Sequence, residues 1–273
     1  MTGEGGPPAT LHAREAGSGT PLLLLHGLGG DHTVWNSVIP EISASFRLLA
    51  PDLRGHGRSP SPEGSTFGFG ELEGDLLGFL DGAGVPSAHV VGLSAGGFLA
   101  LRLALDHPER VRSLTIIGAG LFCDKHTQAV GERWAETYRD DGYEAYAVRL
   151  MKDLYYPDWA EAHLDLLDKF RDAWREADLH GPIRWGLAVR EFDERPRIAR
   201  LRAPTGVIHG MDDQVVDVSH ARLVRQSVPG CELRLLAQTG HMVPVERPEE
   251  TTSSIRAWVE RAEARHAGGS PGP

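Results

Sequence analysis

A serine between closely spaced glycines is the feature that most constrains how this chain can fold. The stretch Gly92–Gly96 (GLSAG) follows the apolar run His89–Val91 and precedes a helical pattern from Ala95 to Asp106. A strand, a sharp turn and a helix in this order hold a serine hydroxyl out above a sheet. Such a turn strains the serine backbone and leaves no room for side chains beside it, which explains the flanking glycines. The pattern predicts that Ser94 is a nucleophile.

The helix after Ser94 supplies a first candidate for charge stabilisation. Ala95 opens this helix, where backbone N–H groups have no intrahelical acceptor and the helix dipole is positive. A negatively charged oxygen that forms beside Ser94 would meet this amide. Ala95 is therefore predicted to be one donor of an oxyanion hole.

A serine hydroxyl is a weak nucleophile at neutral pH, so it needs a base and an acid that orients the base. In proteins with this kind of turn, both follow the serine in the chain, the acid first and the histidine after the last strand. Here Gly210–Asp213 follows the apolar run Gly206–Ile208, and His241 follows the run Leu233–Leu236. We predict His241 as the general base, and both Asp212 and Asp213 are candidates for the acid.

Other histidines and the glycine-rich segments give no second site. Four other histidines lie beside predicted strands and turns or at a helix end, so they are predicted to be structural and not to act as the base: His26, His56, His107 and His209. The chain contains neither an HExxH motif nor paired CxxC motifs, which are typical of metal sites. The glycine loop Gly92–Gly97 is already explained by the turn. We predict no metal and no cofactor.

Short apolar runs alternate with helical stretches along most of the chain. This alternation predicts an α/β fold with a mostly parallel sheet flanked by helices. The predicted strands are Leu22–Leu25, Arg47–Ala50, His89–Val91, Leu114–Ile117, Gly206–Ile208 and Leu233–Leu236.

The segment between the fourth and fifth predicted strands has a different character. Residues 122–199 contain no clear strand, are rich in helix formers, and hold all 5 tyrosines and four of the 6 tryptophans of the chain. We predict that residues 122–199 form a helical cap, and that residues 1–121 and 200–273 form the core domain. Some of the cap aromatics are expected to line a substrate pocket, because ligand sites have mostly apolar walls.

Composition limits the partners of the chain. A formal net charge of -10, without a cluster of lysine and arginine, argues against nucleic acid as a partner. The two cysteines cannot form a disulfide framework, Met1–Thr10 lacks the pattern of a signal peptide, and no apolar run is long enough to span a membrane. We expect a cytoplasmic protein with a small-molecule substrate and no membrane contact, and the sequence leaves its oligomeric state open.

Several motifs together resemble the α/β-hydrolase superfamily from about Leu11 to Glu263. Leu25–Gly30 (LHGLGG), with Trp35 beyond it, is similar to the oxyanion loop of that family. Pro51–Ser59 (PDLRGHGRS) and His107–Val111 (HPERV) are similar to two family segments that are usually structural. The resemblance implies that the backbone N–H of Leu28 is the second oxyanion donor.

The same resemblance separates the two candidate acids. The family motif has a glycine, then an aspartate three residues later, then a valine three residues after that, which places Gly210, Asp213 and Val216 in register. Asp213 is then the acid and Asp212 its rival. The strand Leu114–Ile117, where some relatives carry their acid, is followed by Gly118-Ala119-Gly120, which further favours Asp213.

The resemblance is strongest to the cap-bearing esterase and 3-oxoadipate enol-lactonase branch, through its layout and the segment from Ala188 to Pro204. It implies a serine hydrolase that cleaves a small carboxylic ester or lactone through an acyl-enzyme on Ser94. A C–C bond hydrolase of ring-cleavage products is a second possibility, although Met242 stands where those enzymes usually carry tryptophan. A tailoring esterase or thioesterase for natural products would carry the same motifs, as would a ligand-binding protein without catalysis.

Overall fold

The computed structural model describes residues 9–61, 67–175 and 180–268. Residues 1–8, which belong to the N-terminal segment that we compared with signal peptides, lie outside this part. The described residues form one seven-stranded sheet with the order β1-β3-β2-β4-β5-β6-β7. Only the pair β1 and β3 is antiparallel; the other neighbours are parallel. The predicted class, a mostly parallel sheet flanked by helices, is confirmed.

All six predicted strands are present, each within slightly wider bounds. The strands are β1 (Ala13–Ala16), β2 (Thr20–Leu25), β3 (Phe46–Pro51), β4 (Ala88–Leu93), β5 (Val111–Ile117), β6 (Thr205–Gly210) and β7 (Glu232–Leu236). Strand β1 was not predicted, because its four residues (AREA) include two charged side chains and form no apolar run. It pairs at the edge of the sheet beside β3.

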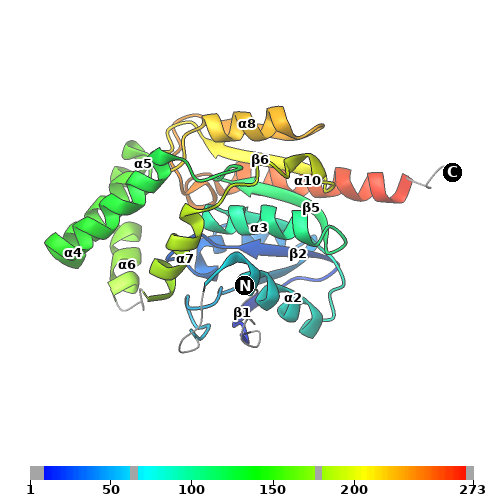
Figure 1. Cartoon of the computed structure of the whole chain (residues 1–273), viewed down its shortest axis with the longest axis horizontal. Helices are drawn as coiled ribbons and strands as arrows, with labels where there is room; N and C mark the ends of the chain where they lie inside the picture. Colours follow the sequence, from blue (N-terminus) through cyan, green and yellow to red (C-terminus); the bar gives the residue numbers. More distant parts are fainter. Residues whose placement is uncertain (1–8, 62–66, 176–179, 269–273) are drawn as a thin grey trace.

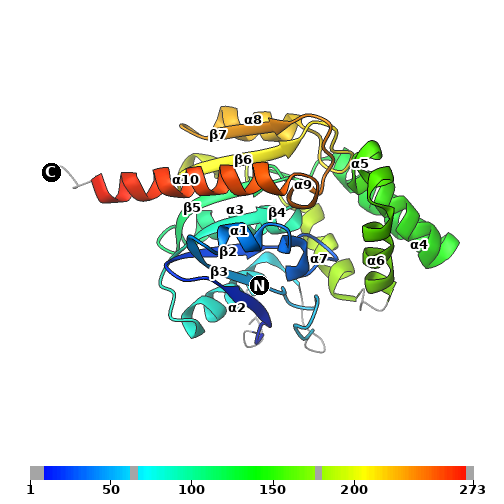
Figure 2. The same ribbon diagram turned by 180° about the vertical axis from the view of Figure 1, so that it is seen from behind.

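Helices cover both faces of the sheet, and each face has its own hydrophobic core. Successive strand residues alternate between the two cores, so Leu23 and Val90 pack into one and Leu24 and Val91 into the other. This alternation follows from the twofold repeat of a strand. Helices α2 (Phe69–Gly82), α3 (Ala95–Asp106) and α8 (Ser219–Ser227) cover the first face, and α1 (Ile39–Ile42) and α10 (Pro248–Gly268) cover the second (Figures 1 and 2).

Between β5 and β6 the described residues form four α-helices: α4 (Lys125–Leu154), α5 (Pro157–Ala162), α6 (Leu164–Arg175) and α7 (His180–Arg190). Figures 1 and 2 show α4, α5 and α6 projecting beyond one end of the sheet. Helix α4 is kinked at Gly142, whose φ is 81°. These helices lie within the range 122–199, and the division of the chain into a core and a cap stays a prediction. No described helix has the length and apolar character needed to cross a membrane.

Candidate active site

Ser94 lies on a strained turn between β4 and α3. Its φ is 54° and its ψ is -123°, a combination that non-glycine residues rarely adopt and that costs about 1–3 kcal/mol. The surrounding structure holds this conformation, because the Ser94 N–H donates to the carbonyl of Ile117 at 2.8 Å. Ser94 is also the N-cap residue of α3, and its side chain makes no capping hydrogen bond with that helix.

The glycines on either side of Ser94 are required by close backbone approach. A Cβ on Gly92 would lie 2.2 Å from the carbonyl oxygen of Gly96. A Cβ on Gly96 would lie 2.4 Å from the carbonyl oxygen of His26. Real Cβ atoms are essentially never found under 3.0 Å from such atoms, so any larger residue at either position would displace the turn, as the sequence predicted.

The loop after β2 lies directly over the Ser94 side chain. A Cβ on Gly27 would stand 3.0 Å from Ser94 Cβ and 3.6 Å from its Oγ. The Gly30 N–H donates to the Gly27 carbonyl at 3.2 Å, and Gly29 has a φ of 73°, so Leu28 and Gly29 are the central residues of a tight turn. The N–H of Leu28 takes no part in that turn bond. The structure therefore places Leu28 directly after the glycine that contacts Ser94, while Ala95 follows Ser94 at the start of α3, and the role of their amides as oxyanion donors stays a prediction.

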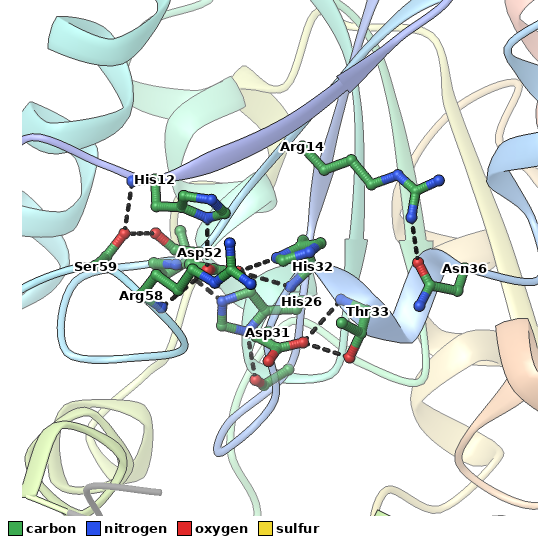
Figure 3. Close-up of polar contacts among 12 residues, drawn as sticks. His12, Arg14, His26, Asp31, His32, Thr33, Asn36, Asp52, Arg58 and Ser59 are labelled. Carbon is green, nitrogen blue, oxygen red and sulfur yellow. Dashed lines mark hydrogen bonds and ion pairs between the residues drawn. The ribbon is translucent and has the colours of Figure 1, made fainter. Parts of the chain in front are cut away.

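The His26 side chain links the loop after β2 to the segment after β3. Its Nδ1 lies 2.8 Å from the Gly27 carbonyl oxygen, and its Nε2 accepts the N–H of Leu53 at 2.9 Å (Figure 3). The two contacts require a neutral imidazole with its proton on Nδ1. Burial lowers the pKa of His26, and the smaller opposing effects of the Gly27 carbonyl and Asp52 do not restore it. The neutral form is thus favoured, and the prediction that His26 is structural agrees with these contacts.

A cluster of polar groups fixes the next part of the loop. The Nδ1 atoms of His12 and His32 lie 3.0 Å and 2.7 Å from the two carboxylate oxygens of Asp52 (Figure 3). Burial alone would raise the pKa of Asp52, but backbone N–H groups of Arg58 and His32 and the His32 side chain outweigh it and lower the pKa.

Within the described residues, the trio of His12, His32 and Asp52 is the one group of three potential metal ligands whose ligand atoms all lie within 4.8 Å of one another. A divalent ion is the kind of group it could hold. Each imidazole already contacts a carboxylate oxygen, however, and these contacts explain the geometry without an ion. We assign no metal to the trio.

Asp213 and His241 form a buried pair after the last two strands. His241 Nδ1 lies 2.7 Å from Asp213 Oδ2, and Asp213 Oδ1 accepts the N–H groups of Val215 and Val216 at 2.8 Å and 3.0 Å. Burial by itself would raise the pKa of Asp213, but the contacts with His241 and His209 outweigh it and hold the pKa well below its usual value. Asp213 is therefore a carboxylate and accepts the Nδ1–H of His241, so in the neutral imidazole the lone pair lies on Nε2.

Asp212, the other candidate acid, contacts Thr239. Asp212 donates its own N–H to the Thr239 carbonyl at 3.0 Å, and its Oδ2 lies 3.4 Å from the Thr239 nitrogen. These contacts are typical of an aspartate that stabilises a turn. Of the two adjacent aspartates, Asp213 is the one that contacts His241.

Gly118 connects the histidine with the serine turn. A Cβ on Gly118 would lie 3.2 Å from the Cε1 and Nδ1 atoms of His241. The preceding residue, Ile117, accepts the Ser94 N–H. The imidazole therefore packs against the end of β5, next to the end of β4 that carries Ser94. The structure thus gathers Ser94, Asp213 and His241 at one end of neighbouring parallel strands, which is where open α/β sheets bind their ligands.

His209 is a neighbour of the acid that sequence reasoning did not assign to the site. Its Nε2 lies 2.8 Å from the Val216 carbonyl and 3.3 Å from Asp213 Oδ2, and the residue is fully buried. Because a carbonyl can only accept, this nitrogen must carry a proton. The one signal in the sequence is its place at the end of β6, four residues before Asp213.

We expect His209→Leu to lower kcat/KM about 10- to 100-fold, because it removes a hydrogen bond to a charged group worth about 1.5–3 kcal/mol. His209→Gln should lose less, since its amide can still donate. Steady-state hydrolysis of a p-nitrophenyl ester, with the melting temperature measured beside it, checks this expectation. Wild-type kcat/KM in the leucine variant would show that His209 does not support the acid.

Helix α7 contacts the loop after β2. A Cβ on Gly186 would lie 3.4 Å from Leu28 Cδ2, and the neighbouring Trp185 is fully buried. The Trp185 ring meets the His56 ring edge-on, with 5.4 Å between centroids. The segment that the sequence predicted as a cap therefore contacts the predicted oxyanion loop through this helix.

Known proteins share both the sequence and the architecture of this chain. The model of the alpha/beta hydrolase fold family matches residues 20–248. A protein of Azorhizobium caulinodans, named provisionally as the carbamate hydrolase RutD, is 31% identical over 251 residues, which cover 89% of this chain and 92% of that protein. The 2-hydroxy-6-oxo-2,4-heptadienoate hydrolase of Pseudomonas putida is 30% identical over 261 residues, which cover 89% of this chain and 89% of that protein.

A solved structure gives the same picture. The enol-lactonase from Burkholderia xenovorans LB400 superposes with a TM-score of 0.85 at 26% identity, over 92% of this chain and 97% of the enol-lactonase. The superposition leaves out little of either chain.

Proposed function

This chain belongs to the α/β-hydrolase family, and we propose that it is a serine hydrolase that cleaves a small-molecule carboxylic ester or lactone. The observation that carries the proposal is the position of Ser94. Its strained turn contacts Gly27, Leu28 and Ala95 are the next residues of the two segments that meet there, and the Asp213–His241 pair follows strands β6 and β7. A nucleophile, a base, an orienting acid and two amide donors are the parts that acyl transfer needs.

In the acylation step, Ser94 Oγ attacks the carbonyl carbon while His241 Nε2 takes its proton. The Asp213 carboxylate holds the Nδ1–H of His241 and stabilises the imidazolium that forms. The negative charge that develops on the substrate oxygen is placed between the Leu28 and Ala95 N–H groups. Loss of one such donor typically costs about 10²–10³ in kcat. The tetrahedral intermediate then expels the alcohol, which receives the proton from His241.

In the second step, water attacks the acyl-enzyme, and the same groups act again. His241 takes a proton from the water, the oxyanion forms between the same two amides, and Ser94 leaves with the proton that His241 returns. A lactone follows this course with its alcohol still attached to the acyl group. Apart from the substrate and this water, every group that the two steps use belongs to the chain.

The substrate class rests on likeness and on a few residues. The enol-lactonase structure covers nearly the whole chain, which supports a lactone or ester. A carbamate carbonyl can be attacked in the same way, so the RutD relative adds carbamates to the substrates that should be tried. Both cysteines are buried and free, so a reducing compartment would suit the chain and we place the enzyme in the cytoplasm, without a nucleic-acid or membrane partner.

A second candidate function is C–C bond hydrolysis of a ring-cleavage product. The 30% identity to the 2-hydroxy-6-oxo-2,4-heptadienoate hydrolase favours it. The residue after the predicted base is Met242, where the sequence resemblance implies tryptophan for such enzymes. We therefore rank C–C bond hydrolysis below ester or lactone hydrolysis. A tailoring esterase or thioesterase whose substrate carries a larger acyl group has the same rank as the C–C bond hydrolase.

A fluorophosphonate probe with intact-mass detection is the test of the proposed function. It is run beside a panel of p-nitrophenyl esters of increasing chain length, simple lactones, a carbamate ester and 2-hydroxy-6-oxo-2,4-heptadienoate. We expect one probe adduct per chain at Ser94, together with turnover of short esters or lactones.

The same test separates the competing functions. An adduct with turnover of the dienoate alone would establish the C–C hydrolase, and an adduct with turnover of long acyl chains alone would establish the tailoring enzyme. An active batch of probe that leaves the chain unlabelled would remove the nucleophile assignment and favour a binding protein.

A further inference from the structure

Glu246 is a buried carboxylate at the end of α9 (Val243–Glu246), close to the predicted base but without a role in the mechanism above. It is 5% exposed. Its two oxygens accept the Gly240 N–H at 3.1 Å and 3.0 Å, and Oε2 also accepts the Tyr156 N–H at 3.0 Å. Gly240 directly precedes His241, and Tyr156 lies just beyond the end of α4. One carboxylate therefore joins the histidine loop to the segment between β5 and β6.

The same two segments are joined by direct backbone hydrogen bonds. The carbonyl of Leu154, the last residue of α4, accepts the N–H groups of His241 and Met242 at 2.8 Å and 3.2 Å. Carbonyls at the end of a helix have no partner within the helix. The histidine loop thus supplies donors that complete the end of α4.

The approach of the two segments leaves no free space. A Cβ on Gly240 would lie 2.7 Å from the Tyr156 nitrogen, 2.8 Å from the Leu154 oxygen and 2.8 Å from the Tyr155 carbonyl carbon. Any movement of the end of α4 relative to the core must therefore move the backbone of the histidine loop or break these hydrogen bonds. The side chain of His241 is bonded on its other side to Asp213 of the core.

The burial of Glu246 is costly, which asks for an explanation. Burial raises its pKa, and the N–H groups of Gly240 and Tyr156, with His241 nearby, offset only part of that effect. A buried carboxylate whose hydrogen-bond partners are neutral N–H groups lowers the stability of the fold, so its place here points to a role in the site.

We propose that Glu246 is a positioning residue, which clamps the loop of the predicted base to the end of α4 so that the position of the cap sets the position of His241. The inference rests on the proposed function, because it takes His241 as the base. A cap shifted by a substrate would then move the base into or out of line with Ser94. A misplacement of about 1 Å in such a site can cost about 100-fold in rate.

Three variants test the clamp. Glu246→Ala removes both acceptors, and we expect kcat per active site, counted with the fluorophosphonate probe, to fall about 100-fold with little change in KM. Glu246→Gln can place its carbonyl where Oε2 lies and accept both N–H groups, so its loss should be about tenfold smaller. Glu249→Ala removes an exposed acid three residues further on and is the matched control with wild-type kcat.

A merely structural Glu246 would give a different result. The alanine variant would then show a lower melting temperature and a smaller fraction of chains labelled by the probe, while kcat per labelled site stayed unchanged. This result would overturn the proposal. An equal loss in the alanine and glutamine variants would also overturn it, because it would assign the effect to the charge instead of the hydrogen bonds.

Hydrogen–deuterium exchange tests the clamp without any turnover. In Glu246→Ala, amides at Gly240–Met242 and at Tyr155–Trp159 should both exchange about tenfold faster or more, while those of β6 stay unchanged. Faster exchange in only one of the two segments would contradict the coupling even in an active enzyme. If the wild-type protein shows neither labelling nor turnover, the proposed function fails, and the exchange result still decides whether the two segments are joined through Glu246.

Discussion

Replacing Ser94 by alanine is expected to abolish turnover, with a loss in kcat of about 10⁶-fold, the size found when the nucleophile of a serine hydrolase is removed. The proton that His241 would take and the oxygen that forms the acyl bond both disappear. The fold should persist, because alanine keeps the Cβ and the strained backbone is held by Ile117 and by α3. Initial rates on the best ester of the panel, with circular dichroism and melting temperature, check this expectation.

Ser113 offers a matched control for the nucleophile. Its Oγ lies 2.7 Å from His89 Nδ1, and His89 Nε2 lies 3.0 Å from Glu263 Oε1, so it too has a histidine and an acid. It lies within β5 instead of on a turn and is only 5% exposed. Ser113→Ala should therefore keep wild-type kcat and the probe adduct. Turnover in Ser94→Ala above a tenth of the wild-type rate, or an adduct that moves to another serine, would refute Ser94 as the nucleophile.

The sheet could be predicted well because parallel strands buried on both faces consist of continuous apolar runs. Such runs as Leu22–Leu25 need no knowledge of the rest of the chain. The strand β1 was not predicted, because an edge strand of four residues buries too little side-chain surface to need an apolar pattern. The serine turn was equally local, since its glycines, its strand and its helix are adjacent in the sequence.

The parts of the site that depend on long-range contacts were harder to predict. Asp212 and Asp213 are indistinguishable by spacing, and only a family motif separated them before the contact of Asp213 with His241 was known. His209 has the same pattern as any buried strand residue. The hydrogen bond between Tyr156 and Glu246 spans 90 positions, and no local pattern reports it. The closeness of Gly27 to Ser94 arises because β4 pairs with β2, although β3 lies between them in the chain.

The second large effect is expected at the acid, where Asp213→Asn should lower kcat/KM about 10⁴-fold. Asparagine keeps the shape of the side chain, but its amide can present an N–H to His241 Nδ1, which then carries no proton. The proton moves to Nε2, and the imidazole can no longer act as a base toward Ser94. The charge that stabilises the imidazolium is lost as well. Measurements of kcat/KM on the best ester of the panel, made for both enzymes under the same conditions, reveal this loss.

Asp212→Asn is the control for this change, and the difference between the two variants carries the argument. Asp212 contacts Thr239 and not His241, so its variant should keep kcat/KM within about threefold, which is less than about 0.7 kcal/mol of transition-state free energy. The rate at which the probe labels Ser94 depends on the base, which Asp212→Asn leaves intact and Asp213→Asn impairs. The probe should therefore label Asp213→Asn far more slowly than Asp212→Asn. A larger loss in Asp212→Asn than in Asp213→Asn would transfer the role of the acid to Asp212, and with it the orientation of His241 inferred from the 2.7 Å contact to Asp213.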